Sequence, residues 1–316
     1  MRIPAILSHY FQPPSPPAQR ANESTSSSVR VVSAPISNSS ESYNPRALKR
    51  QMNDYLHKLE HSANNAIQPD VGAEEMQLQK YLIQAQNYKF DLQIGLLNIS
   101  ERRGGELKNA LQNMGNDTKW HAIVNIAIDD EPGDTPHSVA MEAEKKNGKI
   151  SLVVVDAYRS PFTDTDIAIH LPGLNAALTV LYTGAQKTLS GCNIFALNDA
   201  KAMARNEDAI TRLHQQNYAK IDGDNEYDID DADSLSRREF EHVLPADFYQ
   251  LTTSRRVFNS LPASIQNQLS DHFHQHLNTR TTYENDGCAE EVTYNTAIED
   301  QRIAFARDAL AWLEQR

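Results

Sequence analysis

Short runs of β-branched and apolar residues between positions 120 and 184 constrain the fold of this chain more than any other feature. Gly, Pro and Asp bound these runs, as is typical of strands. One run alternates along its length and leads through "KKNGK" into the next, which predicts a tight turn. The predicted strands are "WHAIVNIAI", "HSVAMEAE", "GKISLVVVDAY" and "AALTVLYTG". We therefore expect a compact sheet in the middle of the chain.

Helical patterns precede and follow these strands. In "PRALKRQMNDYLHKLEHSANNAI", apolar side chains recur every three or four residues, which predicts one buried helix face. These side chains are Leu48, Met52, Tyr55, Leu56 and Leu59. Further helices are predicted over "AEEMQLQKYLIQAQNY", residues 192–205, residues 207–219 and "EDQRIAFARDALAWLEQ". The order of helices, strands and helices indicates an α+β fold.

Composition divides the chain into segments. Residues 12–44 are rich in Ser, Pro and Asn and hold few large apolar side chains, so the segment 1–44 is expected to be disordered. A catalytic core is expected over 116–220, between a first helical part at 45–115 and a second at 241–316. The stretch 221–240 is expected to be an exposed acidic loop, because "DGDNEYDIDDADS" concentrates charges that repel one another.

The bulk properties exclude several classes of function. The formal net charge of −12 argues against general binding to nucleic acid or to anionic membranes. Two cysteines make neither a disulfide framework nor a metal-binding spacing, so we expect no metal. No apolar run approaches the ~18 residues that a membrane span needs. The N-terminus lacks a Sec signal pattern and a glycine after Met1 for myristoylation, so no membrane anchor is expected.

Cys192 begins a predicted helix, where free backbone N–H groups and the helix dipole favour a thiolate. A cysteine nucleophile also needs a base, a group that orients the base, and an oxyanion donor. His137 begins one predicted strand and Asp156 ends the next, so a hairpin would bring them together. Gln186 carries a side-chain amide six residues before the cysteine. Each residue alone is also explained as a core or capping side chain, and the spacing leaves both explanations open.

These residues and their surroundings resemble the YopJ family of type III secreted effector acetyltransferases. The resemblance runs through "HSVAMEAEKKNGKISLVVVDAY", "QKTLSGCNIFALNDA", "ITRLHQQNYAK" and "LPADFYQLTTSRR", and it covers roughly residues 80–310. It implies a cysteine-protease-like core with a central mixed sheet, related to the ubiquitin-like-protein proteases. Helices on both sides of that core are implied to form a regulatory region.

The resemblance also implies a ping-pong reaction. Acetyl-CoA would acetylate Cys192, and the acetyl group would then pass to Lys, Ser or Thr of a host protein. His137 takes the role of the base, Asp156 that of the acid and Gln186 that of the oxyanion donor. Asn198, in the helix after the cysteine, matches a position near bound coenzyme.

The family is activated inside host cells by inositol hexakisphosphate (IP6). The resemblance implies a basic pocket for this polyanion, built by helices on both sides of the core. Its expected ligands are Arg255, Arg256 and Arg302, because the planar donor fork of arginine suits phosphate.

The chain departs from the family pattern beside this pocket. Gln250 stands where members often have a lysine that resembles a self-acetylation site, so self-acetylation there is in doubt. Glu299 and Asp300 stand where basic residues are common, which puts the strength of activator binding in doubt. Lys220 is an alternative cation before the acidic loop.

The resemblance implies that the partners are host signalling or immune proteins, that the chain is monomeric, and that it reaches the host cytoplasm through a type III system. Residues 1 to about 40 are then expected to serve export. Two other functions stay open. A thiol protease that cleaves ubiquitin-like conjugates would use the same acyl-enzyme on Cys192. A degenerate member would bind host proteins without turnover, which the departure at Gln250 favours.

Overall fold

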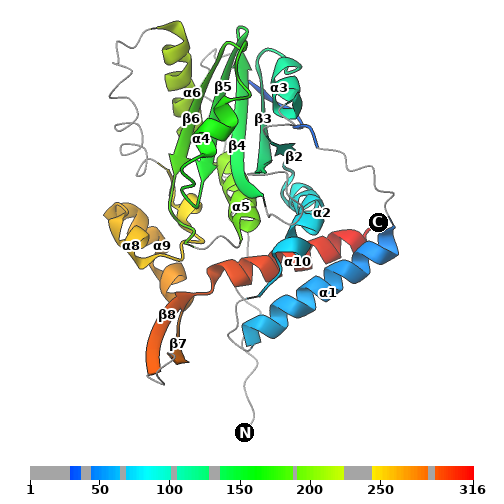
Figure 1. Ribbon diagram of the computed structural model, residues 1–316, viewed down its shortest axis with the longest axis vertical. Coiled ribbons are helices and arrows are strands. Elements are labelled where there is room, and N and C mark those ends of the chain that lie inside the picture. The colour runs from blue at the N-terminus through cyan, green and yellow to red at the C-terminus, as the bar shows by residue number, and fades with distance from the viewer. Residues whose placement is uncertain are drawn as a thin grey trace, which may run out of the picture.

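The computed structural model describes residues 29–36, 44–64, 69–100, 105–127, 136–187, 191–223, 244–283 and 289–316. Within them a mixed six-stranded sheet forms the centre (Figure 1). Its strands are β1 (Arg30–Val31), β2 (Ile94–Ile99), β3 (Thr118–Ile126), β4 (His137–Lys146), β5 (Lys149–Asp156) and β6 (Ala176–Tyr182). β3, β4 and β5 form an antiparallel meander, and β6 pairs in parallel with β5. β1 and β2 both pair in parallel with β3, one after the other along its outer edge.

Helices surround this sheet, and a separate two-stranded hairpin follows it in the chain. The helices are α1 (Pro45–Asn64), α2 (Gly72–Phe90), α3 (Gly105–Gln112), α4 (Thr163–Ala168), α5 (Cys192–Arg205), α6 (Glu207–Asp222), η2 (Ala246–Tyr249), α8 (Arg255–Ser260), α9 (Ala263–Gln275) and α10 (Ala297–Glu314). The hairpin consists of β7 (Leu277–Tyr283) and β8 (Ala289–Asn295).

The two faces of the sheet carry different helices. α5 packs on β3 and β4, and α6 packs on β5 and β6. On the other face, Leu107 of α3 and Ile167 of α4 join an apolar cluster with Trp120 and Met141. Successive strand residues point to opposite faces, so Ile123 joins the cluster under α5 instead. α5 thus lies between the sheet and the helices α2, η2 and α10.

The helical layer brings together the two ends of the described chain. α1 and α2 pack against α10, and α10 also contacts α5 (Figure 1). The predicted face of α1 is confirmed, since Leu48, Met52, Tyr55 and Leu59 are buried and Leu56 is partly buried against the same core. Helices from the N-terminal and C-terminal parts of the sequence therefore form one layer beside the sheet.

A tight turn sets the register of the central hairpin. Asn147 and Gly148 have φ of 52° and 75°, the left-handed conformation that a two-residue hairpin turn requires at both positions. β4 and β5 then pair with Ala140 opposite Val155. The start of β4 and the end of β5 consequently lie at the same end of the sheet.

Three expectations about the flanking segments need correction. Residues 29–36 belong to the stretch expected to be disordered, yet β1 pairs with β3 and Ile36 bridges to Leu96. β2 lies inside the first helical part, and β7 and β8 lie inside the second. β1 is ordered by pairing with a partner far away in the sequence, which composition does not reveal, whereas β7 and β8 pair with each other. α6 continues to Asp222, into the stretch 221–240 that was expected to be an acidic loop. Residues 1–28, 37–43 and 224–243 lie outside the described residues.

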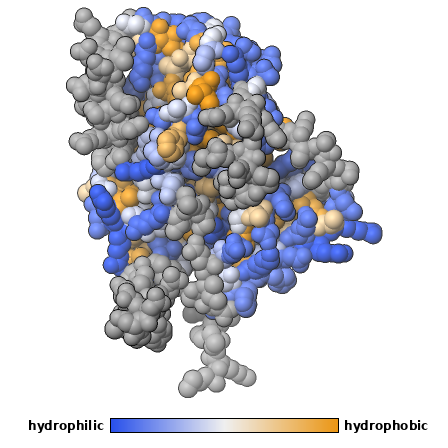
Figure 2. All heavy atoms as spheres, in the orientation of Figure 1, coloured by the Kyte–Doolittle hydropathy of each residue, from blue (hydrophilic) through white to orange (hydrophobic). Residues whose placement is uncertain are grey.

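The surface of one face combines polar and apolar areas. Figure 2 shows hydrophobic side chains reaching the surface in the upper part of this view, with hydrophilic ones around them. Phe162 and Ile169, which flank α4, are 62% and 45% exposed. Among the described residues, no helix has both the length and the apolar composition that a membrane crossing requires.

Gly95 allows the N-terminal segment to lie against β2. A methyl group on its Cα would lie 2.5 Å from both Ala34 Cβ and Pro35 O, and Pro35 O accepts a hydrogen bond from Leu96 N. We predict that Gly95→Ala lowers the free energy of unfolding by about 1–3 kcal/mol, a typical cost of overpacking. Urea unfolding and amide exchange at Leu96 measure this loss.

Gly72, at the start of α2, is the matched control because nothing lies within 4 Å of an added methyl group. Gly72→Ala should keep or raise stability by up to about 1 kcal/mol, since alanine restricts the unfolded chain. Equal unfolding curves for the two variants would contradict the close packing of residues 29–36 on β2.

Candidate active site

His137 and Asp156 meet at the end of the β4–β5 hairpin. His137 Nε2 lies 3.1 Å from Asp156 Oδ1, and the Asp156 side chain is fully buried. This contact leaves Nδ1 as the ring nitrogen for exchanging a proton with a neighbouring group. The hairpin therefore brings together the two residues that the sequence predicted to do so.

The Asp156 carboxylate is held by donors from the loop that follows β5. Oδ1 accepts hydrogen bonds from Tyr158 N and Arg159 N, and Oδ2 accepts them from Ser160 N and Thr163 Oγ1. Burial opposes ionisation, but His137 and these donors outweigh it and keep the pKa of Asp156 below its usual range. Asp156 is thus an anion at neutral pH, with its orientation set before any substrate binds.

Cys192 is the first residue of α5. Its neighbour Gly191 has φ of 99°, and the Gly191 carbonyl accepts hydrogen bonds from Ile194 N and Phe195 N, which close the first turn. Cys192 is 5% exposed, and its sulfur lies 3.7 Å from Pro136 O, just before His137. The thiol therefore sits at the positive end of the helix dipole and beside the start of β4. The second cysteine of the chain lies outside the described residues.

The charge state of His137 depends on both of its partners. Burial lowers the pKa of the imidazole, but the Asp156 carboxylate and the Cys192 sulfur outweigh burial and raise it to about 9. An imidazolium is consequently the main form of His137 at neutral pH. It can stabilise an anionic sulfur and can donate a proton to a leaving group.

Gln186 is fastened to the same end of the sheet. Its backbone N donates to Ala157 O, directly after Asp156, while Ala185 O accepts a hydrogen bond from Thr253 N. The Gln186 side chain is 4% exposed. The structure therefore gathers all four predicted catalytic positions where β4, β5 and β6 meet the start of α5.

The predicted ligand-binding residues are more dispersed. Asn198 is buried in α5, and its side chain donates to Asp247 O. Arg255 and Arg256 are exposed in the first turn of α8. Arg302 is different, because its side chain is only 2% exposed and already pairs with two carboxylates.

A polar network behind the cysteine was not expected from the sequence. Asn193 follows Cys192, and its Oδ1 accepts hydrogen bonds from Ser138 Oγ at 2.5 Å and from Gln79 Nε2 at 3.4 Å. Asn125 donates to Gln79 Oε1, and its Oδ1 lies 2.7 Å from Ser138 Oγ. No periodic pattern marks such residues, so only their buried positions in the folded chain identify them.

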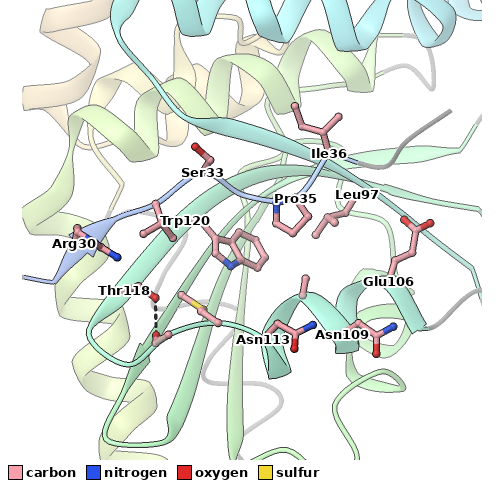
Figure 3. A pocket seen from close by; sticks show the side chains of 14 residues that line it. Arg30, Ser33, Pro35, Ile36, Leu97, Glu106, Asn109, Asn113, Thr118 and Trp120 are labelled. Atoms are coloured by element: carbon pink, nitrogen blue, oxygen red, sulfur yellow. Dashed lines mark hydrogen bonds between the residues drawn. The ribbon is translucent and has the colours of Figure 1, made fainter. Parts of the chain in front are cut away.

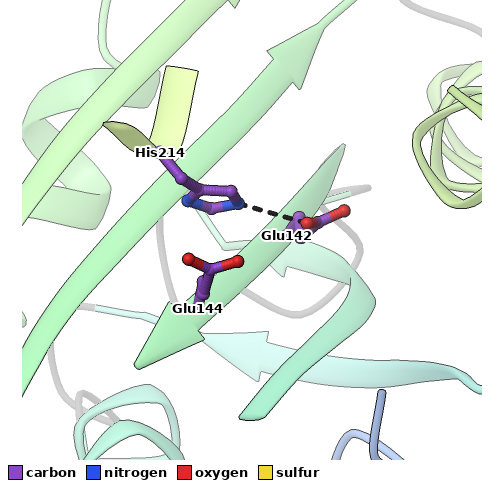
Figure 4. Close-up of side chains that lie close together, drawn as sticks. All are labelled: Glu142, Glu144 and His214. Atoms are coloured by element: carbon purple, nitrogen blue, oxygen red, sulfur yellow. Dashed lines mark hydrogen bonds and ion pairs between the residues drawn. The ribbon is translucent and has the colours of Figure 1, made fainter. Parts of the chain in front are cut away.

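A second buried cluster lies between α6 and the sheet (Figure 4). His214 Nδ1 lies 2.6 Å from Ser151 Oγ, and His214 Nε2 lies 3.2 Å from Glu142 Oε1. Asn217 donates to Ser151 Oγ, so the Ser151 hydroxyl can give its own proton to Nδ1 and leave Nε2–H facing Glu142. The polar groups of His214, Ser151 and Asn217 thereby have partners.

The same cluster contains a donor set of the kind that binds metal ions. Ligand atoms of Glu142, Glu144 and His214 lie within 4.8 Å of one another. However, Glu142 Oε2 also lies 2.6 Å from His121 Nε2, and Lys119 Nζ lies 3.9 Å from Oε1. Burial opposes ionisation, but the two histidines keep the pKa of Glu142 well below its usual range. We interpret the cluster as an ion network that fastens α6 to the sheet.

A pocket of about 540 Å³ is lined by residues of β1, the start of β3 and α3 (Figure 3). Trp120 and Pro35 line it, with Arg30 near one end and Glu106 near the other. None of the four candidate catalytic residues contributes to its lining. This pocket therefore does not belong to the candidate active site.

We predict that Asp156→Asn lowers the pKa of His137, because the anionic partner is lost while the size of the side chain is kept. The midpoint should fall from about 9. A fall of at least about one unit corresponds to about 1.4 kcal/mol of lost interaction. NMR titration of the His137 ring measures it, with Asp222→Asn as a control at a half-exposed carboxylate that pairs with Lys149. An unchanged midpoint in Asp156→Asn would contradict the assignment.

The Asp199 side chain is buried in α5 and is expected to make stability depend on pH. Burial in α5 raises the pKa of its carboxyl well above the usual value, and Asn198 compensates only in part. Above the unfolded-state pKa of about 4, the unfolded chain releases this proton and the folded chain keeps it, so stability falls as the pH rises. Asp199→Asn should therefore melt at a higher temperature than the wild type at pH 7, and the difference should shrink towards pH 4. A constant difference across this range would contradict the burial of a neutral acid.

Comparison with known proteins identifies the relatives of this fold. Similar solved structures are a leucine-deletion form of AvrA with IP6 and CoA (17% identity, TM-score 0.58, 85% of this chain and 99% of that chain) and HopZ1a with IP6 and CoA (14% identity, TM-score 0.57, 85% and 98%). HopZ1a with IP6 alone is similar too (14% identity, TM-score 0.55, 86% and 98%). No curated protein matches the chain.

The shared architecture confirms the predicted α+β class, with a cysteine-protease-like core, a central mixed sheet and flanking helices. The family model described as YopJ Serine/Threonine acetyltransferase matches residues 52–308, which is most of the chain. The chain thus belongs to the YopJ serine/threonine acetyltransferase family.

Proposed function

We propose that this chain transfers an acetyl group from acetyl-CoA to Ser, Thr or Lys side chains of proteins, through an acetyl thioester on Cys192. The observation that carries the proposal is the buried His137–Asp156 pair beside a cysteine at a helix N-terminus. Membership of an acetyltransferase family supports this chemistry over other uses of a reactive thiol.

In the first half-reaction the Cys192 thiolate attacks the acetyl carbonyl of acetyl-CoA. The carbon–sulfur bond to coenzyme A breaks, and the His137 imidazolium gives its proton to the departing thiolate. Gln186 donates its side-chain amide to the oxyanion of the tetrahedral intermediate. Asp156 stays ionised and holds the imidazole in position.

In the second half-reaction the acceptor oxygen or nitrogen attacks the thioester carbonyl. Neutral His137 removes the acceptor's proton, the bond to the Cys192 sulfur breaks, and the ion pair of thiolate and imidazolium is restored. The two half-reactions leave one acetylated side chain and one molecule of coenzyme A. The raised pKa of His137, about 9, supports this cycle because the imidazolium that protonates the departing thiolate is then the main form of the ring at neutral pH.

For the ligands, we propose that Asn198 lies near bound coenzyme and that Arg255 and Arg256 bind phosphates of IP6. The structural relatives AvrA and HopZ1a were solved with these two ligands, and both arginines are exposed here. Arg302 is left out of the phosphate-binding set, because Glu75 and Glu299 already compensate its charge.

The setting of the reaction follows from the family in the same way. We propose delivery through a type III system into the host cytoplasm, with residues 1 to about 40 serving export. Host signalling or immune proteins are the proposed acceptors, and the enzyme is proposed to act as a monomer. Deleting the export segment should stop secretion and leave acetyl transfer intact.

Incubation with labelled acetyl-CoA, IP6 and host lysate tests the reaction. We expect label on acceptor proteins with the wild type and with Cys288→Ala, and loss of transfer by at least about 10³-fold with Cys192→Ala, because no other group takes over a missing nucleophile. Release of a ubiquitin-like protein from its conjugate without any label would favour the thiol protease instead. A Cys192→Ala chain with its full effect in host cells would favour the non-catalytic binder.

A further inference from the structure

α2 presents two buried polar side chains, one helical turn apart, towards the start of α5. Glu75 and Gln79 are each 1% exposed and lie on the same helix face. Each connects to a residue directly beside Cys192. Glu75 pairs with Arg302, whose guanidinium lies against Gly191. Gln79 donates a hydrogen bond to Asn193.

We propose that α2 positions the nucleophile, with Glu75 acting through Arg302 on Gly191 and Gln79 acting on Asn193. Glu75, Gln79 and Arg302 are positioning residues, and none of them touches the reacting atoms. The inference rests on the proposed function only in taking Cys192 as the nucleophile. It gives Arg302 a role different from the phosphate binding that the family resemblance implied.

The first set of contacts connects α1 and α2 to Gly191 through Arg302 of α10. Glu75 Oε1 accepts hydrogen bonds from Tyr55 Oη at 2.9 Å and from Arg302 Nε at 2.5 Å. A methyl group on Gly191 would lie 2.8 Å from Arg302 Nη2 and 2.5 Å from Ile298 Cδ1. The guanidinium and the Ile298 side chain therefore pack directly on the backbone that begins α5.

The second set of contacts connects Gln79 of α2 to Asn193 and Ser138, which follow Cys192 and His137 in the sequence. Gln79 Nε2 donates to Asn193 Oδ1, which also lies 3.9 Å from the Cys192 sulfur. Ser138, the residue after His137, donates to the same oxygen. The residues that follow the base and the nucleophile are thus joined by a hydrogen bond, and Gln79 holds that junction from α2.

Separate contacts already dock α2 on α10. Lys89 pairs with Asp308, and Gln86 donates to the same carboxylate, at the opposite end of α2. The buried pair of Glu75 and Arg302 carries a desolvation cost that a purely structural contact between these helices does not need. Unlike the pair of Lys89 and Asp308, the pair of Glu75 and Arg302 contacts the start of α5. An experiment that compares the two pairs therefore distinguishes a positioning role from a purely stabilising one.

The test compares Arg302→Lys and Gln79→Met with Lys89→Met in a Cys288→Ala background. Lysine keeps the charge at position 302 but loses the planar fork against Gly191. The readouts are the rate of Cys192 alkylation by iodoacetamide, the kcat and KM for acetyl-CoA, and the melting temperature. Lys89→Met breaks the other ion pair between α2 and α10, which is far from Cys192 along both helices.

We expect both test variants to lower kcat at least about tenfold with KM within about twofold, since a nucleophile misplaced by about 1 Å costs up to about a hundredfold in rate. The alkylation rate should also change in both, and it should match the wild type in Lys89→Met. Wild-type rates in both test variants, or equal losses in Lys89→Met, would overturn the proposal.

A second variant and a second readout cover the cases in which Arg302→Lys does not fold or the wild type is inactive. If Arg302→Lys fails to fold, the double variant Glu75→Leu with Arg302→Met removes both buried charges together, and the same loss of kcat is expected from it. If the wild type transfers no acetyl group, the proposed function fails, but the alkylation rates still decide whether α2 positions Cys192.

Discussion

Gly191 has φ of 99° and meets Ile298 and Arg302 so closely that a methyl group would not fit. Only glycine combines that backbone conformation with that close approach. Because its carbonyl accepts the first hydrogen bonds of α5, the helix begins at one position and Cys192 becomes its first residue. The thiol, the positive end of the helix dipole and the contacts from α10 therefore all lie at the first residues of α5.

The other half of the site depends on a hairpin and a buried charge. The left-handed turn at Asn147 and Gly148 sets the register that brings the start of β4 to the end of β5. Asp156 is an anion in the interior, which is unfavourable unless its oxygens have partners. Backbone donors from the following loop, Thr163 and His137 provide them. The imidazolium that results faces the start of α5, so sheet and helix complete one site.

Sequence patterns predicted the parts of the fold that local physics determines. The helix at 192–205 and the hairpin around Asn147 follow from periodicity and turn chemistry, and both are confirmed. β1 was missed because it has only two residues and is ordered by pairing with β3, far away in the sequence. Arg302 looks like a surface cation in its helix, and its buried partner Glu75 is 227 residues away. The roles of the catalytic residues came from the family resemblance, since each of them alone also fits a structural role.

The central claim is that the acetyl group passes through the Cys192 sulfur. Rapid acid quenching after mixing with acetyl-CoA and IP6, followed by peptide mass spectrometry, tests it directly. The account predicts one acetyl group on the peptide that contains Cys192, removable by hydroxylamine as a thioester is, and absent from Cys192→Ala. Acetylated acceptor proteins formed while the Cys192 peptide stays unmodified at every time point would contradict the account.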